Sequence, residues 1–335
     1  MHAVRLHAFG PAGNLRYERV PDPEPGPGQV RIAVAAAGVH LVDTALREGL
    51  RLGPTPTPAE LPTIPGREVA GTVDALGEGV DPAWLGRRVA AHLGMAPGGY
   101  AELAVTGVER LHPLPGSLSE DHAVALVGTG RTAMGVLLFA GLSPADTVLV
   151  LAAAGGIGSL LVQYARHRGA TVVGAAGGPE KVRAVEDMGA DLAVDYTRGD
   201  WTERIREKFG DRPVTYLFEG VGGGLGRTAI ALLAPGGSHL SYGYASAGFS
   251  PEGQTVLGEE EQRELGVTSR SVLGRPMFDR IGGMENIRVL EEEAMALAAE
   301  GVLVPPVHHF PLAHAARAHR ALETRATLGK VVLVP

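Results

Sequence analysis

The stretch that decides the fold is DTVLVLAAAGGIG, residues 146–158. Its first half is a continuous apolar run, which is typical of a strand buried on both faces of a parallel sheet. Its second half, from Ala153 to Gly158, is a glycine-rich turn that leads directly into a helical pattern. Glycines here let the backbone approach a pyrophosphate, whose charge is bound by the N–H groups at the helix start. The stretch predicts a dinucleotide site rather than a purely structural turn, although Ala153 occupies the first position of the usual fingerprint.

Beyond this turn, strands and helices alternate. Gly169 and Gly189 end the first two helices, and Pro179 begins the second, as is common at helix ends. Strands that alternate with helices form right-handed βαβ units, so the pattern predicts an α/β fold with a doubly wound parallel sheet. The strands are expected at 146–152, 171–175, 192–196, 214–218 and 238–242, and the helices at 157–168, 179–188, 201–209 and about 225–233.

The first part of the chain has a different pattern. Short strand candidates at 29–37, 68–75 and 87–91 are separated by proline- and glycine-rich turns. Residues 51–66 contain five prolines and no periodicity, which indicates a long loop of the kind that often lines a site.

The end of the chain returns to this β-rich part, through a helix at 285–300 and a closing segment at 311–335. We therefore expect residues 1–122 and 276–335 to form one domain, and residues 123–275 to form the parallel-sheet domain.

Composition excludes several functional classes. The 335 residues include no cysteine, which excludes disulfides, thiolate-bound metal centres and a thiol nucleophile. The net charge of −7 argues against a nucleic-acid partner or an anionic membrane surface. The N-terminus has no signal-peptide pattern, and no apolar run approaches the ~18 residues of a membrane span. We expect a cytoplasmic protein that acts on a small molecule.

The end of the second strand bears on the choice of dinucleotide. NAD sites place an acidic residue there to bind the ribose 2′-hydroxyl. Here the segment from Gly174 to Gly178 has no carboxylate, and Lys181 follows in the next turn. Small residues beside a lysine favour the 2′-phosphate of NADP(H). The alternative for Lys181 is a solvated lysine on a helix face.

Five stretches, in order along the chain, resemble the zinc-independent quinone oxidoreductases of the medium-chain dehydrogenase/reductase superfamily, the group that includes zeta-crystallin. They are IPGREVAGTVDALGEGV (64–80), GGYAE (98–102), GRTAM (130–134), AAAGGIG (152–158) and PLAHAARAHRALETRATLGKVVLVP (311–335). The resemblance implies a GroES-like β-rich catalytic domain built from both chain ends and a Rossmann domain between them, with NADP(H) as the cofactor. It is weakly specific to any one substrate.

The resemblance also implies which residues bind the cofactor. Lys181, Tyr196 and Arg325 are similar to the residues that contact the adenosine phosphate. The other residues that match are His40, Leu41, Thr132, Ala154, Gly155, Gly156, Ile157, Gly174, Val221, Ser241, Tyr242 and Gly243.

The resemblance also bears on metal binding. Zinc-containing relatives use a cysteine, a histidine in a GHE motif and a further cysteine or acid. The first of these positions is similar to His40, and the GHE motif reads Gly66-Arg67-Glu68. With an arginine in place of the histidine ligand and no cysteine, we expect no metal. The C-terminal histidines are interpreted as scattered surface residues (His308, His309, His314 and His319).

The sequence departs from the resembling family at the positions of the expected proton donor. Relatives place tyrosines shortly after the Asp43 position, and those places here are Ala45 and Arg51. His40 could replace them, because an imidazole can hydrogen-bond to an oxyanion near neutral pH. The alternative is a cleft-wall residue that touches only the cofactor. We expect Arg67 to pair with Asp43 or Glu68, and Tyr100 to serve packing.

The leading hypothesis is an NADPH-dependent oxidoreductase that transfers hydride to a quinone or a conjugated C=C acceptor. One alternative is an enoyl-thioester or tailoring enoyl reductase. A phosphopantetheine or CoA substrate would favour a basic rim, and Arg47, Arg51 and Arg67 leave that open. Another is a catalytically weak NADPH-binding protein. A homodimer is expected through the strand near 267–273, which would otherwise be an exposed edge.

Overall fold

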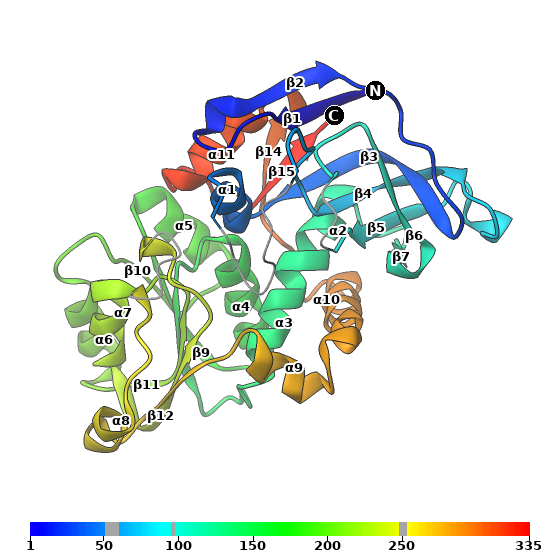
Figure 1. Cartoon of the computed structure of the whole chain (residues 1–335). Helices are drawn as coiled ribbons and strands as arrows, with labels where there is room; N and C mark the ends of the chain where they lie inside the picture. The colour runs from blue at the N-terminus through cyan, green and yellow to red at the C-terminus, as the bar shows by residue number, and fades with distance from the viewer. Residues whose placement is uncertain (51–59, 95–97, 248–252) are drawn as a thin grey trace. The chain divides into compact units, whose positions relative to one another are not determined.

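The computed structural model describes residues 1–50, 60–94, 98–247 and 253–335 (Figure 1). One unit comprises Met1–Thr129 and Pro305–Pro335, and the other comprises Gly130–Val304. The boundaries predicted from the sequence are 122/123 and 275/276. Residues 276–304, predicted to belong to the domain of the chain ends, lie in the unit of the parallel sheet.

The reason is a helix contact that no local pattern encodes. α10 (Arg288–Ala299) packs on α3 (Arg131–Leu137), and Arg131 forms an ion pair with Glu291 at 3.0 Å. A Cβ atom at Gly135 of α3 would lie only 2.3 Å from the sulfur of Met277 and 3.5 Å from Leu290. The glycine thus lets α9 (Arg275–Ile281) and α10 approach α3 closely.

The unit of the chain ends is built on a curved, mostly antiparallel sheet in the order β14-β15-β3-β4-β5-β7, in which β6 also pairs with β3. Val30, Ile32, Val69 and Val89 are fully buried in its core. This is the β-rich GroES-like domain that the sequence predicts. Its elements are β1 (His2–Leu6), β2 (Leu15–Arg19), β3 (Gln29–Val39), α1 (Leu41–Arg47), β4 (Glu68–Leu76), β5 (Arg88–His92), β6 (Leu103–Gly107), β7 (Leu111–Pro113), α2 (Glu120–Ala125), β14 (Val307–Pro311), α11 (Ala315–Glu323) and β15 (Lys330–Val334).

The other unit contains the predicted doubly wound sheet. Its strands are parallel and run in the order β10-β9-β8-β11-β12-β13, so the chain reverses direction across the sheet between β8 and β11. Besides α3, α9 and α10, its elements are β8 (Thr147–Leu151), α4 (Gly156–His167), β9 (Thr171–Ala176), α5 (Pro179–Asp187), β10 (Leu192–Asp195), α6 (Trp201–Phe209), β11 (Val214–Glu219), α7 (Gly223–Ile230), β12 (Leu233–Ser241), α8 (Glu259–Leu265) and β13 (Thr268–Ser271).

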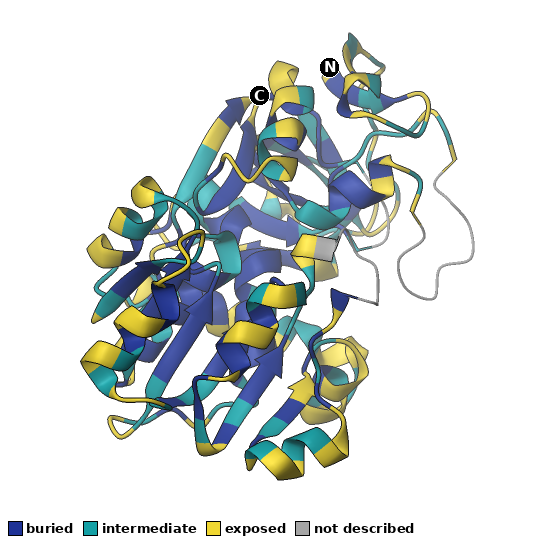
Figure 2. Cartoon of the chain, turned by 90° about the vertical axis from the view of Figure 1, so that its left-hand side faces the viewer, coloured by how far each residue is buried: buried dark blue, intermediate teal, exposed yellow. Residues whose placement is uncertain are grey.

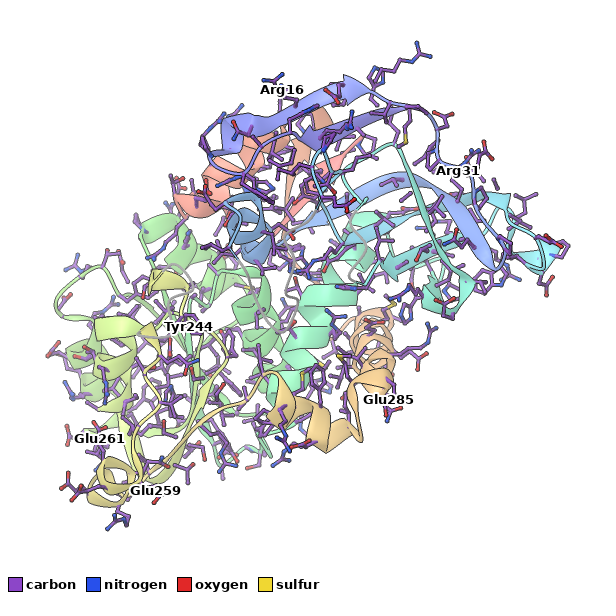
Figure 3. The ribbon with its side chains drawn as sticks, in the orientation of Figure 1. Arg16, Arg31, Tyr244, Glu259, Glu261 and Glu285 are labelled. Carbon is purple, nitrogen blue, oxygen red and sulfur yellow. The ribbon has the colours of Figure 1, made fainter. Side chains whose placement is uncertain are left out.

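Burial follows the expected layers. Leu149, Val150 and Leu151 of β8 have no exposed surface, which confirms a strand buried on both faces. Figure 2 shows the strands as mostly buried, while the outer faces of the helices are exposed. The charged residues of α8 follow this rule, and the labelled side chains of Glu259 and Glu261 project from the ribbon (Figure 3). Within the described residues, no helix has the length and apolarity needed to span a membrane.

Candidate functional site

The glycine turn after β8 has a backbone that only small residues allow. Ala152 adopts a left-handed conformation with φ of 51°, and its carbonyl accepts the N–H of Gly155 at 2.9 Å. A Cβ atom at Gly158 would lie 2.3 Å from that carbonyl oxygen. Because the first turn of α4 packs against the end of β8 in this way, the glycine at 158 is required by close approach.

The turn presents hydrogen-bond donors for an anion. The N–H groups in the first turn of an α-helix have no acceptor within the helix, and here they belong to Gly156, Ile157 and Gly158. Gly155 precedes them in an extended conformation, so no side chain separates these donors from an approaching group. The residues present therefore fit the pyrophosphate of a dinucleotide.

The other predicted residues of this unit meet at one edge of the sheet. The strands are parallel, so residues at their carboxyl ends share that edge. Gly155 follows β8, Tyr196 follows β10, and Val221 follows β11. The remaining residues are Ala154, Gly156 and Ile157 at the glycine turn, Gly174 near the end of β9, Lys181 in α5, and Ser241, Tyr242 and Gly243 at the end of β12; Thr132 is in the first turn of α3.

Gly174 has a packing role of its own. A Cβ atom there would lie 2.3 Å from Val185 and 3.2 Å from Ala153. The missing side chain lets α5 pack directly on β9. Gly174 is therefore required by the fold, whatever contact its backbone makes with a cofactor.

The turn between β9 and α5 is organised by a carboxylate that no sequence motif marks. Asp195, at the end of β10, accepts the N–H of Gly178 at 3.0 Å and the hydroxyl of Thr197 at 2.7 Å. These hydrogen bonds lower the pKa of Asp195 below its usual value. The ring of Tyr196 lies against Gly177, where a Cβ atom would be 3.1 Å away. Only strand pairing brings Asp195 beside this turn.

A second unforeseen carboxylate, Glu219, lies fully buried at the end of β11. It accepts the N–H groups of Val221 at 2.5 Å and Gly222 at 2.6 Å, and the hydroxyl of Thr255 at 2.7 Å. Burial alone would raise the pKa of Glu219, but these hydrogen bonds and the nearby His239 hold it below its usual value. Glu219 thus shapes the turn that carries Val221.

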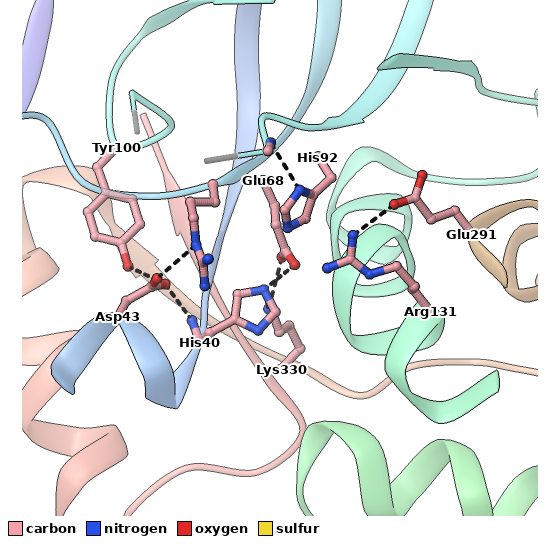
Figure 4. A network of polar contacts seen from close by, with 10 residues as sticks. His40, Asp43, Glu68, His92, Tyr100, Arg131, Glu291 and Lys330 are labelled. Atoms are coloured by element: carbon pink, nitrogen blue, oxygen red, sulfur yellow. Dashed lines mark hydrogen bonds and ion pairs between the residues drawn. The ribbon is translucent and has the colours of Figure 1, made fainter. Parts of the chain in front are cut away.

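In the unit of the chain ends, His40 belongs to a cluster of three side chains (Figure 4). Its Nε2 atom contacts an oxygen of Glu68 and lies 3.0 Å from Nζ of Lys330. Lys330 also forms an ion pair with the other Glu68 oxygen at 2.9 Å. Burial alone would raise the pKa of Glu68, but the contacts with His40 and Lys330 hold it well below its usual value. Lys330 could not be predicted as a member of this cluster, because no sequence motif marks it.

Two glycines make room for the Glu68 carboxylate. A Cβ atom at Gly38 would lie 2.1 Å from Oε2 of Glu68, and one at Gly128 would lie 1.7 Å from Oε1. No other residue type at either position would leave the carboxylate in place. The Glu68 carboxylate can therefore occupy its buried position only because Gly38 and Gly128, which are far apart in the chain, have no side chains.

A second set of polar side chains lies around Asp43 on α1. The Oδ2 atom of Asp43 accepts hydrogen bonds from the backbone N–H of His40 at 2.8 Å and from the hydroxyl of Tyr100 at 3.2 Å (Figure 4). The Tyr100 hydroxyl also lies 3.1 Å from Nε2 of His319. Tyr100 is fully buried, and burial raises its pKa well above the usual value. Its ring packs in the core of this unit, and its hydroxyl orients the Asp43 carboxylate.

The expectation that His319 lies at the surface is wrong, and the structure closes one possibility that the sequence left open for Arg47. His319 is not a surface residue: it is fully buried, and burial lowers its pKa to about 4. Arg47 cannot belong to a basic rim, because its side chain is 1% exposed and bound to Glu323 at 2.6 Å. Hydrophobic packing of α11 over α1 covers both residues, which local sequence does not reveal. Arg51 lies outside the described residues.

The remaining predicted residues of this unit have clear positions. Arg67 is near Asp43, with 3.8 Å between Nε and Oδ1, which is an ion pair without a hydrogen bond. Leu41 is partly buried in the first turn of α1. Arg325 is exposed after α11 and adopts a left-handed backbone with φ of 57°. Among the described residues, no group of three or more histidine and acidic side chains is arranged to hold a metal ion.

Two family profiles match the chain. Residues 26–116 match the alcohol dehydrogenase GroES-like domain, and residues 156–290 match the zinc-binding dehydrogenase family. The first match lies in the β-rich unit and the second in the unit of the parallel sheet.

Complete proteins are similar over almost the whole chain. A 2-haloacrylate reductase of Burkholderia is 33% identical, with 99% of this chain and 98% of the relative covered. A quinone oxidoreductase of Pseudomonas aeruginosa is 32% identical, with 99% of both covered. The solved structure of a mycobacterial protein complexed with NADPH is 32% identical, covers both chains completely and superposes with a TM-score of 0.83.

Proposed function

Because this chain belongs to the zeta-crystallin-like quinone oxidoreductase family of the medium-chain dehydrogenase/reductase superfamily, we propose that it is an NADPH-dependent reductase of quinones or conjugated C=C acceptors. The observation that carries the proposal is the edge of the parallel sheet, where the glycine turn fits a pyrophosphate. The end of β9 fits an NADP(H) phosphate because it carries small residues and no acid, with Lys181 on the helix that follows.

Bound NADPH supplies a hydride that the acceptor receives. The protein binds and orients the two molecules. We assign the pyrophosphate to the N–H groups after Gly155, the adenosine phosphate to Lys181, Tyr196 and Arg325, and the remaining cofactor contacts to the other predicted residues. His40 is assigned to the acceptor, as a hydrogen-bond donor to the oxygen on which negative charge develops. Arg67, beside Asp43, occupies the place of a histidine ligand in zinc relatives, so the reaction is proposed to need no metal.

Steady-state oxidation of NADPH with a panel of acceptors tests the function. The panel contains simple quinones, enones, 2-haloacrylates and enoyl thioesters, each measured before and after treatment with a chelator. We expect turnover with a quinone or an enone, unchanged by chelation. NADPH binding without turnover on any acceptor would instead support the NADPH-binding protein. Loss of activity together with a stoichiometric metal would overturn metal independence.

The structure supports an enoyl-thioester reductase less well than a reductase of small conjugated acceptors. A thioester carrying a phosphorylated pantetheine arm would favour a basic rim, and Arg47 is buried in an ion pair. Arg67 keeps 22% of its side chain exposed and is 3.8 Å from a carboxylate. Small conjugated acceptors therefore fit the described residues better.

We expect NADPH to bind at least tenfold more tightly than NADH. Each charge-assisted contact from Lys181 or Arg325 to the 2′-phosphate should stabilise the complex by roughly 1.5–3 kcal/mol. Fluorescence titration of both cofactors measures the ratio, and Lys181→Ala should reduce it. Lys208→Ala, which changes a lysine on α6, is the control. Equal dissociation constants in the unmodified protein would refute the assignment.

We also propose a homodimer through β13. This strand pairs with β12 on one side and ends the sheet in the described chain. The N–H of Val272 bonds to Ser241, so the N–H of Ser271 points to the opposite, outer edge. Light scattering should give twice the chain mass of 34.7 kDa, and Ser271→Pro should shift the population to monomer. The control is Glu264→Ala on α8. A monomer at micromolar concentration would exclude the dimer.

A cytoplasmic location remains a prediction, as does the absence of nucleic-acid and membrane partners. Fractionation of cells that express the protein would check the location.

A further inference from the structure

The cluster of His40, Glu68 and Lys330 can hold its protons in more than one arrangement. Ionised Glu68 can only accept hydrogen bonds, and a lysine ammonium can only donate them. Nε2 of His40 faces both groups at once. If Nε2 carries a proton, it donates to Glu68 and points an N–H at Lys330. If it carries none, it accepts from Lys330 and turns its lone pair toward Glu68.

These two arrangements differ only in the place of one proton. When Nδ1 also carries a proton in the first, His40 is an imidazolium and Lys330 is a neutral amine. In the second, Lys330 is an ammonium and His40 is neutral, with its proton on Nδ1. Both have the same total charge, and the proton crosses 3.0 Å between Nζ and Nε2.

We propose that Lys330 is the proton source of the reductase and that its proton reaches the acceptor through the ring of His40. This inference rests on the proposed function. Once the acceptor has gained a hydride and its two electrons, it is an anion that needs one proton. The Nδ1–H bond of His40 breaks and a bond from hydrogen to the acceptor forms. In the same step a Nζ–H bond of Lys330 breaks and a Nε2–H bond of His40 forms. Lys330 is left as a neutral amine, and solvent returns the proton after product leaves.

The surroundings support this assignment. The side chain of Lys330 is 4% exposed and that of Glu68 is fully buried, while 21% of the His40 side chain is exposed. The ring of His40 can thus connect a buried proton to a partly open side. Burial lowers the pKa of Lys330, although Glu68 opposes this effect, and a lowered pKa makes the ammonium a better acid.

Other charged groups also face the cluster. Asp43 on α1 favours the ammonium form of Lys330, and Arg67 disfavours it. His92 on β5 is opposite Glu68 in the strand register and interacts with its charge. Glu68 stays ionised in both arrangements. It holds Lys330 and His40 together and is therefore a positioning residue, and Lys330 acts only through His40.

Replacing Lys330 separates a proton source from a structural ion pair. Lys330→Arg keeps a cation beside Glu68, but an arginine does not release its proton in proteins. Lys330→Met removes both the cation and the proton. We expect both variants to lose enone turnover by on the order of 10²-fold, while the KM for NADPH and the turnover of simple quinones change little. Quinones are spared because their reduced anions can take protons from water. The matched control is Lys208→Met.

A measurement on the free protein needs no turnover. The chain has three lysines, so ¹³C labelling at lysine Cε gives three signals, and the signal lost in Lys330→Arg is that of Lys330. Its titration midpoint should lie below the ordinary lysine value of about 10.4. In Glu68→Gln the midpoint should fall further, because the carboxylate that favours the ammonium is gone.

Two results would overturn the proposal. One is a Lys330 signal that titrates at or above the ordinary lysine value. The other is full enone turnover in Lys330→Arg, which would leave only an ion pair. If the Lys330 variants do not fold, Lys181→Arg and Lys208→Arg assign the other two lysine signals, and the titration of the remaining signal in the unmodified protein still decides. If no acceptor of the panel supports NADPH oxidation by the unmodified protein, the proposed function fails. The lysine titration still reports on the cluster in that case.

Discussion

Glu68→Ala should lower the free energy of unfolding by about 3–5 kcal/mol, the usual cost of leaving one partner of a buried ion pair without its counter-charge. The side chain of Lys330, which is 4% exposed, would remain buried and would lose the carboxylate that now lies 2.9 Å from its Nζ atom. The two glycines that reserve space for Glu68 would then border a cavity. Urea denaturation followed by circular dichroism in the far ultraviolet measures the change.

The control for this experiment is Glu24→Ala. Glu24 is an exposed carboxylate 3.8 Å from Arg31, and pairs of this kind contribute at most about 1 kcal/mol. The double variant Glu68→Met with Lys330→Met removes both charges and should recover part of the lost stability. If Glu68→Ala costs no more than Glu24→Ala, the carboxylate is not the buried counter-charge described above.

His40→Ala should lower the turnover of enones by on the order of 10²-fold at saturating NADPH, which is the typical cost of losing one donor to an oxyanion. The dissociation constant for NADPH should change little. His40→Asn should recover part of the turnover with simple quinones, because an amide can donate a hydrogen bond but cannot pass on a proton. Stopped-flow measurement of NADPH oxidation, together with fluorescence titration, gives both quantities.

A cleft-wall residue would give the opposite pattern. Both substitutions would then change the affinity for NADPH and leave the saturated rate alone. An unchanged saturated rate in His40→Ala would remove His40, and the proton path through it, from the mechanism. Tyr100 cannot replace it, because its hydroxyl is fully buried between Asp43 and His319.

The parallel-sheet unit could be predicted largely from local sequence. The strand expected at 171–175 is β9, the helix expected at 201–209 is α6, and the glycine turn has the predicted place between β8 and α4. These elements are encoded by apolar runs, glycine stops and a proline start, which act over a few residues. The glycine turn could be located for the same reason.

The candidate acceptor site could be predicted only in part. His40, Arg67 and Tyr100 were marked by their motifs, but the partners that define their states were not. Lys330 lies 290 residues from His40, and strand pairing between β15 and β3 brings the two together. A carboxylate at the end of β10 likewise organises the turn after β9. Such contacts depend on register between distant strands, which no local pattern encodes.

By itself, the sequence determined the class of sheet, the glycine turn, the family and the chemistry excluded by the absence of cysteine. The tertiary structure alone decided which charges are buried and what they touch. It placed Arg47 and His319 in the interior and put residues 276–304 with the parallel sheet. The physical reason is that backbone conformation follows from steric and apolar patterns along a few neighbouring residues, whereas the charge state of a buried group is set by atoms within a few ångströms, and those atoms come from anywhere in the chain.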